Sequence, residues 1–103
     1  MARYIIRFQA NPAAWPIDPA QTLALWEGVV TAGTVAIEDG TFSDVVWTSG
    51  ISGYAVVDAE SKDGAIAATS PFFPLFTQSI EEGVSWTEAT TAILAGARAA
   101  AGQ

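Results

Sequence analysis

The sequence predicts an α+β domain in which helices cover one face of a four-stranded antiparallel sheet. Apolar and polar residues alternate in four short segments, as in strands that bury one face. Segments between these strands begin with helix-capping residues and carry apolar residues at helical spacing. The chain has 103 residues and no cysteine, so one domain without disulfides is expected over residues 1–103.

The first strand and the first helix have the clearest patterns. In residues 2–9 (ARYIIRFQ), every second residue from Tyr4 to Phe8 is apolar and faces one side. After a proline-broken loop, Asp18 and Pro19 form a helix N-cap followed by proline at the first helical position. The helix is expected to end near Glu38 and is apolar nearly all round, so both of its sides need cover. One short chain cannot supply two covering layers, and a partner subunit is therefore expected.

The remaining segments complete a β-α-β-β-α-β order with an additional helix. Turn residues at 49–53 join the second and third strands. The S-x-x-E box of Ser85 and Glu88 starts the additional helix. The expected elements are strands at 42–49, 53–59 and about 76–82, a helix from the Ser61 cap to Thr69, and a helical extension within 84–103.

The stretch SPFFPLF, residues 70–76, is an uncharged corner between the second helix and the fourth strand. Pro71 stops the helix, and the two prolines set the path of the chain into the strand. Phe72 and Phe73 cannot point the same way. We therefore expect one of them in the core and the other at a pocket mouth or a subunit contact.

This order is the ferredoxin-like split βαβ arrangement, and three stretches resemble the muconolactone isomerase-like branch of the dimeric α/β-barrel proteins. They are DPAQTLALWEGVV…EDGTF, GYAVVDAES and SPFFPLFTQSIEEGV. The resemblance covers about residues 3–84 and leaves out the helix after Trp86. It implies two sheets, one per subunit, packed in a homodimer or higher homo-oligomer. It also implies a small apolar substrate between sheet and helices, and proton transfer without a cofactor.

Composition excludes several classes of function. The net charge is −7 with only four basic residues, so the basic footprint needed for nucleic acid or an anionic membrane is missing. The chain has no histidine or cysteine, and DAESKDG lacks the ligand spacing of a calcium loop, so no metal site and no cofactor are expected. It also lacks a membrane-spanning run and a signal-peptide pattern, and a cytoplasmic location is expected.

Four polar residues are candidates for proton transfer. Glu27 is the preferred acid or base, because it is the only carboxylate in the middle of the first helix. The resembled family carries charged acid–base residues in that helix and histidines elsewhere, and this chain departs from it. Asp44, which is expected to share a strand face with Phe42, can pair with Arg7 to polarise a carbonyl or can form an ordinary ion pair. Tyr54 can donate to an oxyanion or simply be a half-buried strand residue.

Six aromatic side chains are candidates for the walls of a substrate pocket, with ordinary core packing as the alternative. They are Trp15, Trp26, Trp47, Phe72, Phe73 and Phe76. The resulting hypothesis is a small cofactor-independent enzyme that isomerises or cyclises a hydrophobic carbonyl-containing metabolite by positioned proton transfer. The alternatives are a cofactor-free monooxygenase of the same fold and a non-catalytic protein that binds a ligand or forms an oligomeric assembly.

Overall fold

The computed structural model describes residues 1–48 and 50–102, and its elements follow the predicted order. Ser49, predicted to end the second strand and begin the hairpin turn, lies outside the described residues, as does Gln103 in the predicted extension. The strands are β1 (Ala2–Ala10), β2 (Phe42–Trp47), β3 (Ser52–Ala59) and β4 (Phe76–Gly83). The helices are α1 (Pro19–Glu38), α2 (Lys62–Thr69) and α3 (Trp86–Ala100), with 3-10 turns at Pro12–Ala14 and Ser70–Phe72.

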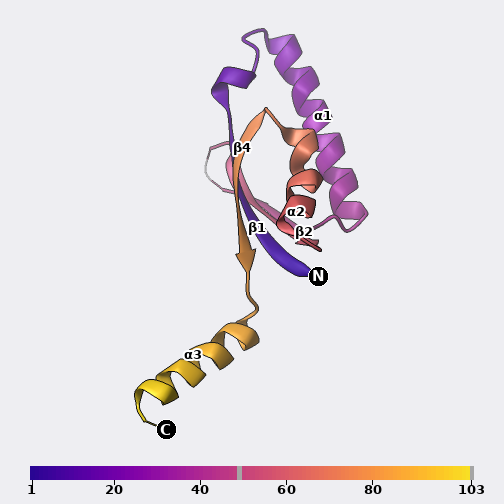
Figure 1. Cartoon of the computed structure of the whole chain (residues 1–103). Coiled ribbons are helices and arrows are strands. Elements are labelled where there is room, and N and C mark those ends of the chain that lie inside the picture. The colour runs from indigo at the N-terminus through magenta and orange to yellow at the C-terminus, as the bar shows by residue number, and fades with distance from the viewer. Residues whose placement is uncertain (49, 103) are drawn as a thin grey trace.

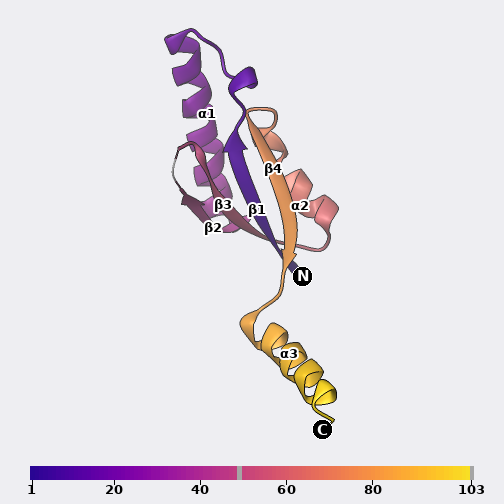
Figure 2. The ribbon, with the colours of Figure 1, turned by 90° about the vertical axis from the view of Figure 1, so that its left-hand side faces the viewer.

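The four strands form one sheet in the order β2-β3-β1-β4, and each neighbouring pair is antiparallel. Helices α1 and α2 lie on the same face of this sheet (Figure 1). Figure 2 shows α1 on the β2 side and α2 on the β4 side; α1 contacts β2, and α2 contacts both β3 and β4. The predicted ferredoxin-like α+β fold is confirmed, and none of the described helices lies over the second face of the sheet.

The helix starts follow from the capping residues seen in the sequence. The side chains of Asp18, Ser61 and Ser85 each accept a hydrogen bond from the backbone N–H three residues later. Such caps satisfy amide groups that have no partner inside the helix. After α1, Gly40 adopts a left-handed conformation with a φ of 82°, which glycine tolerates without strain.

The core lies between the sheet and the two helices. Its most deeply buried side chains are Ile6 and Val57, on the neighbouring strands β1 and β3. From α1, Val29 is buried, whereas Leu23 and Val35 are more than half exposed. One side of the apolar helix α1 is therefore covered within a single chain, and the other side is not.

A β-bulge separates two residues that the sequence placed on one strand face. Phe42 pairs with Val57, but Asp44 pairs with Val56, so the register shifts between them. Phe42 is buried under the helices, while Asp44 is exposed on the open face of the sheet. The prediction that Phe42 and Asp44 share a face was wrong, because the extra residue of a bulge reverses the alternation of side chains.

Helix α3 extends away from the rest of the molecule beyond the end of β4 (Figures 1 and 2). The chain measures 65 × 26 × 20 Å, and its radius of gyration is 17.7 Å. A compact chain of this length has a radius of gyration of about 13 Å. Trp86 is 83% exposed and Ile93 is 67% exposed on α3. In the part of the chain that the structure describes, no helix is long and apolar enough to cross a membrane.

Candidate functional site

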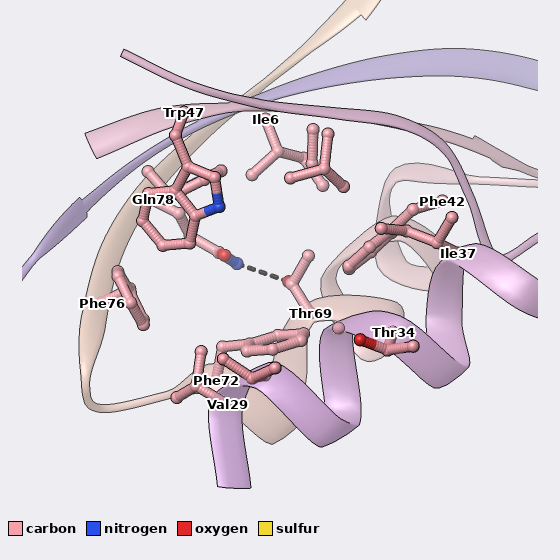
Figure 3. Close-up of a pocket in the computed structure, with 15 residues that line it drawn as sticks. Ile6, Val29, Thr34, Ile37, Phe42, Trp47, Thr69, Phe72, Phe76 and Gln78 are labelled. Carbon is pink, nitrogen blue, oxygen red and sulfur yellow. Dashed lines mark hydrogen bonds between the residues drawn. The ribbon is translucent and has the colours of Figure 1, made fainter. Parts of the chain in front are cut away.

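An apolar pocket of about 190 Å³ lies between the sheet, α1 and the end of α2 (Figure 3). Ile6 and Ala55 of the sheet contribute to its wall, and Val29 of α1 contributes from the other side. Phe72 lies against Phe42, with ring centroids 5.8 Å apart, at the α2 end. The same strand and helix faces that build the core therefore line the pocket, which is partly open to solvent.

Three uncharged polar side chains also line this pocket: Thr34, Thr69 and Gln78. Gln78 Nε2 donates a hydrogen bond to Thr69 Oγ1 at 2.6 Å, and Thr69 Oγ1 donates to the backbone oxygen of Ile66 at 2.9 Å. Figure 3 shows the first of these bonds inside the pocket. The lining contains no Asp, Glu, Lys or Arg of the described residues. It therefore suits an uncharged ligand.

The predicted aromatic wall is present in part. Phe76 is the centre of an aromatic cluster, with the rings of Phe8, Trp15, Trp26 and Trp47 between 5.7 and 6.2 Å from its centroid. Among the predicted wall residues, Trp47, Phe72 and Phe76 line the pocket.

The other three predicted wall residues do not line the pocket. Trp15 and Trp26 stack on each other, with centroids 4.8 Å apart. Both pack against the ring of Phe76 without lining the pocket. Trp15 Nε1 also donates to the backbone oxygen of Leu75 at 2.9 Å, which ties the loop before α1 to the start of β4. Phe73 is 71% exposed, on the outside of the proline corner.

Glu27 is an exposed residue of α1 and is not among the residues that line the pocket. It precedes Val30 by three positions and Thr34 by seven, and both of these residues do line the pocket. Residues with this spacing share one side of a helix. Glu27 is therefore close to Thr34 along α1 but lies at the flank of the side that lines the pocket, outside its wall.

Arg7, Asp44 and Tyr54 lie on the open face of the sheet, away from the pocket. The Arg7 guanidinium is 5.7 Å from the ring centroid of Tyr54, its neighbour across β1 and β3. Both residues border a shallow, polar hollow of about 450 Å³. Asp44 lies on β2, and β3 separates it from β1, so the expected Asp44–Arg7 pair is not formed within one chain.

Arg3 and Asp58 form an ion pair on the same open face. Arg3 Nε donates to Asp58 Oδ1 at 2.9 Å, and Nη2 donates to Oδ2 at 3.2 Å. The hydrogen bond from Arg3 lowers the pKa of Asp58, and a hydroxyl bond from Ser43 lowers it further. Across the same residue ranges, no group of three His, Cys, Asp or Glu side chains could hold a metal ion.

The sequence interpretation did not single out the polar residues of the pocket. Gln78 lies on β4 between Phe76 and Ile80, at a position where the alternation predicts an apolar, inward-facing residue. A polar residue at such a position is a signal of a buried hydrogen bond or a site. Thr69 gives no comparable signal, because it becomes part of the pocket only when α2 packs beside β4.

The chain is similar to a known protein in its fold. No family model matches the chain, and a search of curated proteins also finds no match. Among solved structures, a crystal structure of muconolactone isomerase is similar, with a TM-score of 0.67 and 16% sequence identity. The similarity covers 81% of this chain and 88% of that chain. The chain therefore has the fold of muconolactone isomerase, which confirms the resemblance seen in the sequence.

Proposed function

We propose that the protein binds a small, uncharged, largely apolar metabolite in the pocket between α1 and the sheet, and isomerises or cyclises it without a cofactor. The pocket itself is the observation that supports this most strongly. Its volume is about 190 Å³, and its wall is apolar apart from uncharged polar groups such as Gln78 and Thr34. A charged ligand would lose its hydration there without gaining a partner. A cavity of about 150 Å³ accepts benzene, so this pocket suits a ring with a few substituents.

The proposed chemistry needs a pocket of the right shape and one side chain that transfers a proton to or from the ligand. Apolar walls hold a flexible carbonyl compound in a reactive conformation, which is the larger part of an intramolecular cyclisation or isomerisation. The hydroxyl of Thr34 polarises the oxygen of the ligand. Glu27 exchanges the proton from the flank of α1 beside the pocket, since the described residues of the wall include no carboxylate.

A ligand-binding protein without catalysis is the second candidate. The observation that favours it is the lack of charged side chains among the described residues of the pocket wall. General acid–base catalysis requires a titratable group within hydrogen-bond reach of the proton that moves. If Glu27 does not reach the ligand, the pocket is a site for carrying an apolar molecule.

We also propose that the protein is a homodimer or a larger homo-oligomer. The open face of the sheet carries the partly exposed side chains of Ile5, Val46 and Tyr54, and no helix in residues 1–48 and 50–102 covers it. Helix α3 has 15 residues, a length at which an isolated helix is marginal in water. Its exposed Trp86 and Ile93 also need a covering surface. A second copy provides apolar surface for both regions.

Turnover of small hydrophobic carbonyl compounds, followed by NMR of the products, tests the proposed activity. Glu27→Gln is expected to lower kcat by about 100-fold or more, while Glu38→Gln, the same change at the end of α1, leaves it unchanged. Equal activity of Glu27→Gln and the unmodified protein contradicts the role of Glu27. Turnover that requires oxygen supports a monooxygenase instead, and tight binding without any product supports the carrier.

A further inference from the structure

The hydrogen bond between Gln78 and Thr69 determines which atom of the Gln78 amide is available to a ligand. Thr69 is 4% exposed, and its hydroxyl oxygen lies 2.9 Å from the backbone oxygen of Ile66 and 3.4 Å from that of Ala65. A carbonyl oxygen can only accept, so the single hydroxyl hydrogen of Thr69 points to the helix backbone. The lone pairs of Thr69 Oγ1 are then left for Gln78, which has to present its Nε2 as the donor at 2.6 Å.

This arrangement leaves Gln78 Oε1 as an acceptor without a partner. In the described part of the chain, no side chain or backbone group donates to Oε1. The amide lies in the pocket among the rings of Trp47 and Phe76 (Figure 3). A ligand that fills the pocket displaces water from Oε1 and has to replace the lost hydrogen bond. An acceptor that is buried without a donor destabilises the complex.

We propose that the pocket selects an apolar ligand that carries a hydroxyl group, which donates its hydrogen bond to Gln78 Oε1. This inference rests on the proposed ligand pocket and specifies the chemical class of its ligand: an alcohol, a phenol or an enol. A ketone of the same shape has no hydrogen to donate to Oε1 and can accept only from the second hydrogen of Nε2, so Oε1 stays without a donor. The enol of a carbonyl compound belongs to the favoured class, which connects the preference to the proposed proton transfer.

Cyclohexanol and cyclohexanone test the preference, because they match in size and shape and differ at one oxygen. Their dissociation constants are measured by NMR titration, with the side-chain amide signals of Gln78 as the local probe. Cyclohexanol is expected to bind about tenfold more tightly. Thr69→Val keeps the shape of the side chain but removes the hydroxyl, so the amide is free to turn and the two affinities come within about twofold. Thr69→Ser restores the hydroxyl and the preference.

The outcomes separate this inference from the proposed function. Equal binding of the two probes, or a preference for the ketone, overturns the inference and leaves the ligand pocket standing. Binding of neither probe up to its solubility limit contradicts the ligand pocket and the inference together. Gln78→Met provides a second test if Thr69→Val does not fold. It removes the acceptor at similar size, and a preference for cyclohexanol that persists in this folded variant overturns the inference.

Discussion

The guanidinium of Arg7 lies over the ring of Tyr54, 5.7 Å from its centroid, on the face of the sheet that the described helices leave open. The apolar pocket lies on the opposite face, between the sheet and α1. Two of the polar residues that the sequence suggests for catalysis are thus separated from the pocket by the sheet itself. If two copies pack through their open faces, Arg7 and Tyr54 lie between subunits.

Self-association through the open face is tested by placing a charge there. Ile5 is 37% exposed on this face, and Ile5→Glu is expected to dissociate the oligomer, because a carboxylate at an apolar interface loses its hydration. Ile66, on α2, is 45% exposed, and Ile66→Glu is the matched control with unchanged association. Sedimentation velocity measures both. An unmodified protein that sediments as a monomer contradicts this packing.

The aromatic cluster around Phe76 is expected to be a main source of stability. Phe76 is 5% exposed and contacts four other rings, so Phe76→Ala should lower the free energy of unfolding by about 3–5 kcal/mol. Phe73→Ala removes the same ring from a position that is 71% exposed and should change it by less than about 0.5 kcal/mol. Urea denaturation of the two variants checks the contrast. Similar losses of unfolding free energy in the two variants would show that the aromatic cluster is not a main source of stability.

Two glycines are expected to respond to alanine in opposite directions. A Cβ at Gly53 would collide with the backbone oxygen of Val46 and lie 2.8 Å from Phe8 Cζ, so Gly53→Ala should destabilise the fold by about 1–3 kcal/mol. A Cβ at Gly28 of α1 meets nothing within 4 Å, and Gly28→Ala should stabilise it by about 0.5–1 kcal/mol. Thermal unfolding of the two variants shows whether each substitution raises or lowers the stability. A stable Gly53→Ala protein would contradict the close approach of β2 to β3.

The Arg3–Asp58 pair predicts a pH dependence of stability. The folded state lowers the pKa of Asp58, so the contribution of the pair is complete above the ordinary aspartate pKa and is lost as the pH falls through the lowered value. The stability difference between the unmodified protein and Asp58→Asn should therefore shrink on acidification. The difference is small because both side chains are exposed. Asp44→Asn, on the same face, is the control, and a difference for Asp58→Asn that is constant down to about pH 2 contradicts the account.

The fold could be predicted from the sequence because its signals are local. Capping residues such as Asp18 and Ser61 mark the helix starts, and the alternation in β1 assigns Tyr4 and Ile6 to the core face. The side on which Asp44 lies could not be predicted, because a bulge depends on how β2 meets β3 and not on composition alone.

The candidate site was predictable only in part. Large aromatic residues such as Trp47 and Phe76 often line pockets whatever the fold, and both line this one. The alternation in β4 marks Gln78 as a polar residue at an inward-facing position, but its partner Thr69 joins it only through the packing of α2 beside β4, which no spacing in the sequence indicates. Charged residues such as Glu27 can be recognised in the sequence as groups able to take part in proton transfer. Their positions relative to a cavity are set by tertiary structure.

Ligand binding in a variant with a filled pocket tests the central claim most directly. Gly33 lines the pocket on α1, and a Cβ there meets nothing within 4 Å, so Gly33→Leu fills the cavity without straining the helix. Gly28→Leu makes the same change on the same helix, outside the pocket wall. The account predicts that the affinity for cyclohexanol, measured by NMR titration, falls by more than about tenfold in Gly33→Leu and stays unchanged in Gly28→Leu. Equal affinity in the two folded variants would contradict the claim that the ligand occupies this pocket.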